Sequence, residues 1–245
     1  MPKFSQIIFP LTAAPDSRDV RFAAPYVAQV WALLTNLDSH IMEIMTTTGN
    51  KQGGIKYIVD VGACVGGTAI PYAVTFLDAK ILAIEPSRHN YGFLQFNCKD
   101  FASVELLKMA VHNKNGFIQI AAPSTEQRPS RTDCHINTGL ISAHGGSEHF
   151  REDVAADTLD NIVDRKVDWL KIDVEGHEQA VLEGATRILS EDKPVLQVEM
   201  SDENQAMGPY TLSSLLTLIG TAGYVSVGRM RADIVFMAKE RLNGG

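Results

Sequence analysis

The sequence predicts an α/β protein with a doubly wound, mainly parallel sheet covered by helices on both faces. Short, continuously apolar segments alternate along the chain with segments whose apolar residues recur at helical spacing. Continuously apolar strands are typical of a parallel sheet buried on both faces, because βαβ connections place helices on each side. The chain has 245 residues, of which 45% are apolar, so it is long enough for one large domain of this class.

The expected elements follow from these patterns. Strands are predicted at residues 55–61, 80–84, 104–109, 116–120, 167–172, 195–199, 224–227 and 234–238. Helices are predicted at residues 67–77, 91–100, 178–189 and 212–220. The last two strands form a closing pair in this prediction.

Residues 1–54 are predicted to form an N-terminal helical extension to the main domain at 55–245. An irregular arm containing three prolines occupies residues 1–17, and apolar residues at steps of three and four predict a helix over 18–47. The glycine-rich run at 49–54 then serves as a linker. Whether this extension acts as a lid, a dimer contact or plain core packing is left open, and so is a homodimer.

Residues 122–150 interrupt the alternation of strands and helices. They are rich in Pro, Ser, Thr, Gly and His and show no periodicity, so we expect a long loop there. The loop would leave the carboxyl side of the sheet, where such folds bind ligands, which makes it a candidate substrate loop.

Composition narrows the classes of partner and compartment. The net charge of −7 disfavours nucleic-acid binding, and no apolar run approaches the 18 or so residues of a membrane span. The three cysteines are widely separated and form no CxxC pair, which fits a reducing compartment. We therefore expect a cytoplasmic protein without a signal peptide.

Two sites follow the first two strands of the main domain. The turn from Asp60 to Thr68 contains Gly62 and Gly66 and leads into a helix, a context in which backbone N–H groups can approach a ligand. Its spacing is neither GxGxxG nor a P-loop. Glu85 follows Gly62 at close to the interval of about 20 residues at which an acid binds ribose hydroxyls in nucleotide-binding folds.

A third cluster follows the strand at 167–172. Asp173, Glu175 and Glu178 surround His177 at the start of the next helix. Acidic residues at a helix N-terminus can simply stabilise the helix dipole, and here Glu178 could cap while Asp173 points into the cleft. The spacing matches neither HExxH nor an EF-hand, so we expect no metal.

The chain resembles FkbM-type methyltransferases over about residues 55–200. The resemblance rests on the glycine turn, on Glu85-Pro86, Asn97 and Thr158-Leu159-Asp160, on the run from Leu170 to Glu178, and on Pro194 leading to Glu199. It implies a Rossmann-like seven-stranded sheet whose last strand is antiparallel, and S-adenosylmethionine as cofactor. Cys64 departs from the family, where this position is often Asn.

The resemblance also implies roles for individual residues. Asp60 and the glycine turn would hold the methionine part of the cofactor, Glu85 the ribose, and Ala110 and Val111 one side of the adenine. The full set of implied cofactor-binding residues is Asp60, Gly62, Ala63, Gly66, Thr68, Glu85, Pro86, Ser87, Ala110, Val111 and Asp173.

The expected reaction is O-methylation of a hydroxyl on a sugar, polyketide or similar small acceptor. A hydroxyl is a weak nucleophile at neutral pH and gains from a positioned base, for which Asp173 and His177 are the candidates. Glu175 and Glu199 would support the base or accept hydrogen bonds from the substrate. The alternatives are N-methylation of a peptide or amine, an NAD-dependent oxidoreductase and a non-catalytic binding module.

Overall fold

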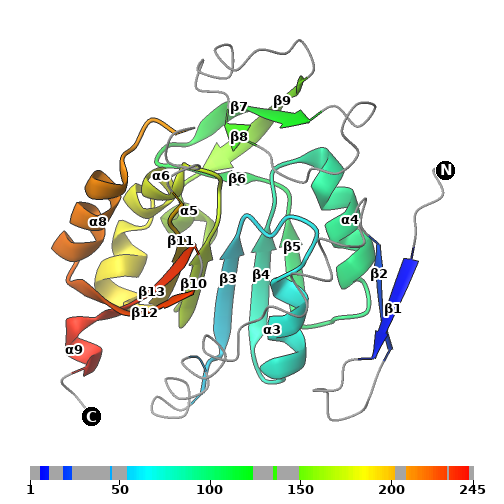
Figure 1. Ribbon diagram of the computed structural model, residues 1–245, viewed down its shortest axis with the longest axis horizontal. Helices are drawn as coiled ribbons and strands as arrows, with labels where there is room; N and C mark the ends of the chain where they lie inside the picture. Colours follow the sequence, from blue (N-terminus) through cyan, green and yellow to red (C-terminus); the bar gives the residue numbers. More distant parts are fainter. Residues whose placement is uncertain are drawn as a thin grey trace.

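The computed structural model describes residues 6–10, 19–23, 45, 54–123, 135–136, 149–201, 208–230 and 232–242. A seven-stranded sheet runs through the centre of this part of the chain, with helices on both faces (Figure 1). In spatial order its strands are β12 (Tyr224–Met230), β13 (Asp233–Ala238), β11 (Val195–Glu199), β10 (Trp169–Ile172), β3 (Tyr57–Val61), β4 (Lys80–Ile84) and β5 (Val104–Leu107).

Strand direction confirms the predicted fold class. The strands from β11 to β5 pair in parallel, whereas β13 pairs antiparallel with both β11 and β12. The last strand of the chain is therefore inserted antiparallel between its two neighbours, as the resemblance implied.

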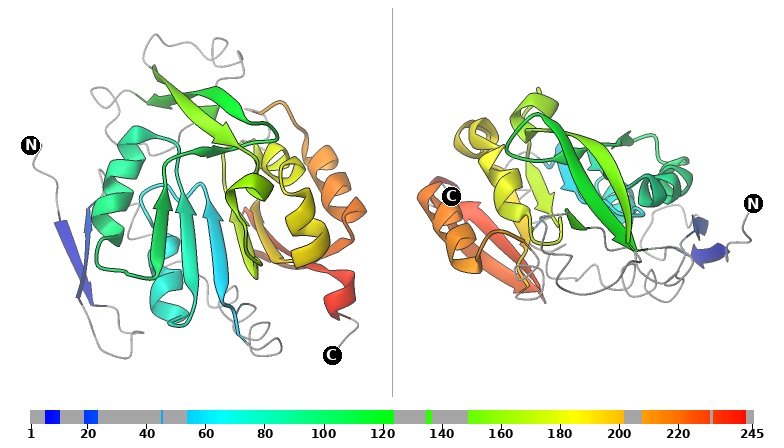
Figure 2. Two further views of the ribbon diagram at one scale, coloured as in Figure 1. Left: turned by 180° about the vertical axis from the view of Figure 1, so that it is seen from behind. Right: turned by 90° about the horizontal axis from the view of Figure 1, so that it is seen from above.

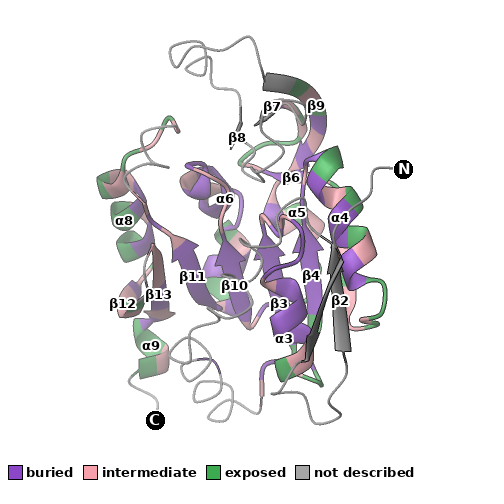
Figure 3. Ribbon diagram, turned by 45° about the vertical axis from the view of Figure 1, so that its right-hand side comes forward, coloured by how far each residue is buried: buried purple, intermediate pink, exposed green. Residues whose placement is uncertain are grey.

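The helices divide between the two faces of the sheet. On one face, α3 (Ala69–Thr75) and α4 (Arg88–Cys98) pack against the side chains of alternate strand positions such as Ile58 and Ile81. The opposite positions, including Val59, pack against the helices of the other face. Those helices are α5 (Leu159–Ile162), α6 (Glu178–Glu183), the π-helical turn η2 (Ile188–Asp192) and α8 (Leu212–Thr221). Figure 3 shows that the central strands are buried along both faces.

The helix predicted at residues 178–189 is interrupted in the structure. The α-helix ends at Glu183, and a Cβ atom at Gly184 would lie 2.4 Å from the carbonyl oxygen of His112. Glycine disfavours continuation of a helix, and here it permits this close backbone contact. A short helix, α9 (Lys239–Leu242), follows β13.

A second sheet covers the carboxyl ends of β3 and β4 (Figures 1 and 2). Its strands, in spatial order, are β6 (Ala110–Val111), β9 (His149–Asp157), β7 (Gly116–Pro123) and β8 (His135–Ile136). The prediction of one loop over 122–150 is wrong at both ends, because β7 and β9 pair antiparallel as far as Pro123 and His149. It is also wrong at β8, which pairs with β7. Residues 124–134 and 137–148 lie outside the described residues.

The N-terminal segment also differs from its prediction. β1 (Gln6–Pro10) and β2 (Asp19–Ala23) form an antiparallel pair that lies beside α4 (Figure 2). Residues 6–10 of the predicted arm and residues 19–23 at the start of the predicted helix are therefore strands, and the rest of the arm lies outside the described residues. In the sequence of β2 the apolar residues Val20 and Phe22 alternate with polar ones, as is typical of a strand. Apart from Met45, which is helical and buried, residues 24–53 lie outside the described part. No helix among the described residues is long and apolar enough to cross a membrane.

Candidate active site

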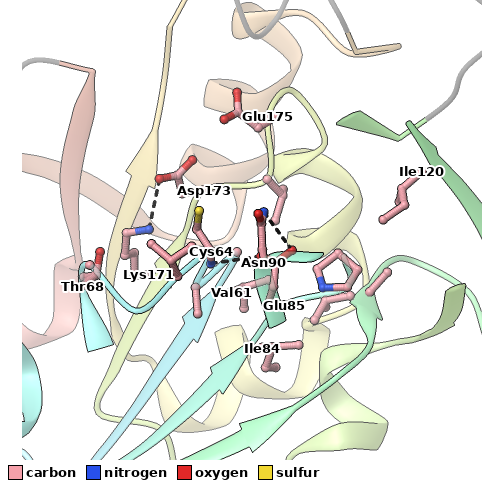
Figure 4. A pocket seen from close by; sticks show the side chains of 18 residues that line it. Val61, Cys64, Thr68, Ile84, Glu85, Asn90, Ile120, Lys171, Asp173 and Glu175 are labelled. Carbon is pink, nitrogen blue, oxygen red and sulfur yellow. Dashed lines mark hydrogen bonds and ion pairs between the residues drawn. The ribbon is translucent and has the colours of Figure 1, made fainter. Parts of the chain in front are cut away.

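A cavity of about 240 Å³ lies at the carboxyl ends of β3, β4 and β10 (Figure 4). Within the sheet, β4 and β5 lie on one side of β3, and the later strands β10 and β11 lie on the other side of β3. β3 therefore lies at the point where the strand order reverses, which is where open α/β sheets bind their ligands. Residues of the second sheet line the cavity from above.

The turn after β3 forms the floor of the cavity and depends on Gly62. This glycine has a φ of +83°, and a Cβ atom there would lie 1.8 Å from the carbonyl oxygen of Asp173. The backbone N–H groups of Gly62 and Ala63 both donate to the carbonyl of Ile84, at 3.0 Å each. These contacts hold the ends of β3, β4 and β10 together, so Gly62 has a structural role in addition to lining the cavity.

Two further features stabilise the same turn. Gly66 has a φ of +95° and packs closely against Leu94 and Cys98 of α4. The Asn97 side chain donates to the carbonyl of Val65 at 2.8 Å. Gly66 is therefore buried beneath the turn and does not line the cavity.

Glu85 projects from the end of β4 into the cavity although it is only 4% exposed. Its carboxylate accepts hydrogen bonds from the backbone N–H groups of Cys64 (3.0 Å) and Ser87 (2.9 Å) and from the Asn90 side chain (3.5 Å). Burial raises its pKa to about 8, even though these hydrogen bonds act in the opposite direction. The carboxylate is thus fixed in direction, and its protonation changes close to neutral pH.

Ser87 and Asn90 hold this region in place. The Ser87 hydroxyl caps α4 by accepting from the backbone N–H of Asn90 at 3.5 Å, so Ser87 is a helix cap and does not line the cavity. Asn90 and Pro86 do line it. The sequence prediction missed Asn90, although a polar residue three positions after a helix cap is the signal that would have found it.

Asp173 and Lys171 form the opposite wall of the cavity, after β10. The Lys171 ammonium lies 3.1 Å from the Asp173 carboxylate and 3.5 Å from the carboxylate of Asp60. Burial by itself would raise the pKa of Asp173, but Lys171 and a hydrogen bond with Glu199 outweigh it and hold this pKa below its usual value. Asp60 is completely buried beneath Lys171 and does not line the cavity, contrary to the predicted contact with the ligand.

The other carboxylates near Asp173 differ in whether they line the cavity. Glu175 lines the cavity, and Glu178 is buried with its carboxylate accepting from the backbone N–H groups of Val174 (3.1 Å) and Gly176 (3.0 Å). Glu178 therefore stabilises the loop before α6 by hydrogen bonds, and it is also the acidic residue in the first turn of that helix. Glu199 lies beside Asp173 without lining the cavity, and burial together with the Asp173 charge raises its pKa to about 9.

His177 does not lie on the cavity. It is 3% exposed, and its ring centroid lies 6.3 Å from that of His112 and 6.4 Å from that of Tyr210, in an edge-on arrangement with the tyrosine. The expectation that His177 would lie beside the reacting group is not met, because the chain turns at Gly176 and carries the imidazole behind the loop.

The apolar wall of the cavity comes from the second sheet. Ala110 and Val111 of β6 line it, as predicted, and Ile120 of β7 joins them although no sequence signal had marked it. All three side chains are almost completely buried. Among the described residues, no group of three or more His, Cys, Asp or Glu is arranged to hold a metal ion.

Comparison with known families identifies the family of the chain. The family model described as "Methyltransferase FkbM domain" matches residues 60–226, which is more than half of the chain. The chain belongs to the FkbM methyltransferase family. The match begins at Asp60 in β3 and ends within β12, so it includes β4, β5, β10 and β11 completely and β3 and β12 in part.

One solved structure supports this fold, and two others are more distantly similar. The FkbM methyltransferase of Methylobacillus flagellatus KT is 17% identical with a TM-score of 0.51, over 75% of this chain and 43% of that one. A putative caffeoyl-CoA O-methyltransferase from Staphylococcus aureus (11% identity, TM-score 0.48) covers 86% of this chain and 89% of its own. Magnesium protoporphyrin IX methyltransferase from Synechocystis PCC 6803, solved with bound SAM, is 12% identical with a TM-score of 0.47, covering 87% and 81%.

At these identities the likeness concerns the fold alone, and the chain spans less than half the length of the Methylobacillus protein. No protein of curated function matches the sequence.

The cavity fits the chemistry of S-adenosylmethionine, the cofactor that the sequence resemblance implies. Glu85 can accept from ribose hydroxyls, apolar residues of the second sheet suit an adenine, and Asp173 and Glu175 suit a cationic ligand. Of the predicted cofactor and catalytic residues, those that line the cavity are Gly62, Ala63, Thr68, Glu85, Pro86, Ala110, Val111, Asp173 and Glu175. Those that do not are Asp60, Gly66, Ser87, His177 and Glu199.

Proposed function

We propose that this FkbM methyltransferase transfers the methyl group of S-adenosylmethionine to a hydroxyl oxygen of a small acceptor, such as a sugar or polyketide. The observation that carries the proposal is the position of two carboxylates on either side of the turn after β3. Glu85 follows β4, Asp173 follows β10, and β3 lies between these strands. A nucleoside bound by Glu85 would extend across the turn and place a cationic group beside Asp173.

The binding roles follow from the chemistry of the lining residues. A carboxylate accepts from two neighbouring hydroxyls at once, which suits Glu85 to a ribose. Ala110, Val111 and Ile120 offer the apolar surface that an adenine ring requires. The negative charges of Asp173 and Glu175 attract the ammonium and sulfonium groups, both of which are positive.

Bound S-adenosylmethionine supplies an electrophilic methyl group, so the protein mainly aligns the acceptor oxygen with it, at about 3–3.5 Å. The acceptor hydroxyl loses its proton as the new bond forms, and a carboxylate beside the oxygen can take that proton. We assign this role to Asp173, because it lines the cavity and Lys171 holds it ionised. Glu175 would accept hydrogen bonds from other acceptor hydroxyls.

An amine acceptor is the second candidate, and the acidic wall of the cavity favours it. The carboxylates of Asp173 and Glu175 would attract a protonated amine as well as a polyol. Mass spectrometry of the methylated product separates the two, since one reaction yields an ether and the other a methylamine. Membership of a methyltransferase family argues against hydride transfer to or from a nicotinamide.

The cofactor assignment is tested by calorimetric titration with S-adenosylhomocysteine and, separately, with NADH. We expect S-adenosylhomocysteine to bind and NADH not to bind. At pH 9, where Glu85 is ionised, Glu85→Ala removes a charged hydrogen-bond acceptor and should weaken S-adenosylhomocysteine binding by about 10- to 100-fold. Glu105→Ala, an exposed carboxylate on β5, is the matched control and should bind as the wild type does. Binding of NADH in place of S-adenosylhomocysteine would overturn the proposal.

A further inference from the structure

Lys171 lies in the middle of a row of polar residues that crosses the centre of the sheet. In the strand register it lies opposite Asp60 of β3 on one side and Gln197 of β11 on the other. All three side chains are buried, and Lys171 is 4% exposed. Burying an ammonium group is costly unless carboxylates pair with it, so a lysine at this position requires a specific reason.

The Lys171 ammonium contacts one carboxylate in the interior of the sheet and one at the wall of the cavity. Its 3.5 Å contact is to Asp60, which is inaccessible. Its 3.1 Å contact is to Asp173, which lines the cavity (Figure 4). Lys171 itself also lines the cavity. A change at Lys171 therefore acts directly on the carboxylate to which we assign proton acceptance.

Other groups face the ammonium from the neighbouring elements. The Tyr72 hydroxyl of α3 donates to Gln197 at 2.8 Å, and Gln197 donates to Asp233 of β13 at 3.2 Å. Burial would lower the pKa of Lys171, but Asp173, Asp60, Asp233 and Tyr72 together raise it well above its usual value. Lys171 is therefore charged at neutral pH.

Asp173 and Glu199 lie side by side at the ends of adjacent strands, and two neighbouring, partly buried carboxylates do not both ionise readily. The pKa of Glu199 is raised to about 9 and that of Asp173 is lowered, so at neutral pH the pair holds one proton, on Glu199. Lys171 contacts Asp173 directly, and its positive charge favours the ionised form of this carboxyl group.

We propose that Lys171 is a positioning residue of the methyl-transfer site: its ammonium, which also pairs with the buried Asp60, fixes the Asp173 carboxylate at the cavity wall in its ionised form. The consequence for the reaction rests on the proposed function of Asp173. The electrostatic arrangement can be tested without any cofactor.

The first experiment follows the Asp and Glu carboxyl carbons of the protein by NMR across pH, with the Asp173 and Glu199 signals assigned from Asp173→Asn and Glu199→Gln. In the wild type we expect Asp173 to titrate below 3.8, its ordinary value, and Glu199 near 9. The reverse order in the wild type would overturn the proposal, and this comparison requires no variant that disturbs the core.

The second arm removes the ammonium. Lys171→Met alone would leave Asp60 buried without its cation, so the variant is made together with Asp60→Asn, and Asp60→Asn alone is the matched control. Loss of an adjacent positive charge should raise the pKa of Asp173 by about 1 to 3 in the double variant compared with this control. An unchanged titration of Asp173 would show that Lys171 has only a structural role.

S-adenosylhomocysteine titrations of the same proteins separate this inference from the proposed function. If the ligand binds and the Asp173 titration is unchanged in the double variant, the inference fails and the proposed function stands. If the Asp173 titration changes as expected but no protein binds S-adenosylhomocysteine, the proposed function fails. If the inference and the proposed function both hold, the double variant should bind S-adenosylhomocysteine more weakly at pH values below the new pKa of Asp173. Asp60→Asn alone should not show this loss.

Discussion

Cys64 adopts a left-handed backbone conformation, with a φ of +52°, in the turn that forms the floor of the cavity. Residues with a Cβ atom pay about 1–2 kcal/mol for this conformation, and glycine does not. We expect Cys64→Gly to have a higher free energy of unfolding than Cys64→Ala by about 1 kcal/mol, measured by urea denaturation. Both variants lose the thiol, so the comparison isolates the backbone.

The same pair of substitutions at Cys98, the last residue of α4, provides the control. A helical backbone favours alanine, so there the order should be reversed, with alanine the more stable by about 0.5–1 kcal/mol. If alanine were also the more stable at position 64, the left-handed conformation of this turn would be contradicted.

The raised pKa of Glu85 predicts that cofactor binding depends on pH. Ribose hydroxyls donate hydrogen bonds, so they prefer the ionised carboxylate, and below about pH 8 binding must first remove a proton from Glu85. The affinity for S-adenosylhomocysteine should therefore rise between about pH 6 and 8, by at most about tenfold per pH unit, and then level off. Calorimetry in two buffers of different ionisation enthalpy should detect proton release at pH 7, and its absence there would contradict the prediction.

The polar residues of the site show what could and could not be predicted from the sequence at this scale. Glu85 and Asp173 follow apolar strands directly, so their places at the sheet edge were predictable. Whether Asp60 contacts a ligand or pairs with Lys171 depends on the register of β3 and β10, which no local pattern encodes. His177 was misplaced for a similar reason, because its direction depends on the turn at Gly176.

At the scale of elements, Glu152 joins the second sheet to the main one. From β9 its carboxylate accepts from the backbone N–H of Arg88 at 2.9 Å, at the start of α4, and pairs with Lys108 at 3.0 Å. The adjacent strand β7 carries Ile120, which lines the cavity. Glu152 thus helps to hold the apolar wall above the site.

Glu152→Gln should weaken both contacts, because an amide is uncharged and offers one oxygen acceptor in place of two. We expect a loss of about 1 kcal/mol in the free energy of unfolding and a several-fold weaker affinity for S-adenosylhomocysteine. Asp153→Asn changes the next residue of the same strand, which bonds only within the second sheet to Gln119, and serves as the control. Equal affinities for the two variants would argue against this role of β9.

The strands also differ in how well the sequence predicted them. β4 and β11 are continuously apolar or nearly so, and their predicted bounds agree with the structure. β9 was missed because His149–Asp157 contains four charged residues, which gives no apolar run, and it is held by pairing with β7. The five residues of β2 were predicted to be helical because they lie at the start of residues 18–47, a longer segment with apolar residues at helical spacing.

At the scale of the whole molecule, the fold concentrates carboxyl groups in its interior along the carboxyl edge of the sheet. Asp60, Glu85, Glu178, Glu199 and Asp233 all have raised pKa values, and burial is the largest cause for each. A ligand site at the point where the strand order reverses requires polar groups in a sheet that is otherwise apolar. The cost of burying them is part of what the packed core must offset.

This arrangement predicts that the protein becomes less stable as pH rises above neutrality. Glu85 and Glu199 retain protons in the folded state up to about pH 8 and 9, whereas in the unfolded chain both lose them near 4.5. The folded state then binds more protons, so the free energy of unfolding decreases with pH, by on the order of 1 kcal/mol per pH unit for each group. His89 and His112 have lowered pKa values and act in the opposite direction only below about 6.5.

Urea denaturation at intervals between about pH 7 and 9 therefore provides the measurement. Stability should decrease throughout this range in the wild type, with the contribution of Glu85 ending first because its pKa is the lower of the two. Glu199→Gln removes one of the two titrating groups and should flatten the decrease, whereas Glu105→Gln on the surface of β5 should leave it unchanged. A stability that is constant or increases over this range would mean that these carboxyl groups are already ionised in the folded protein.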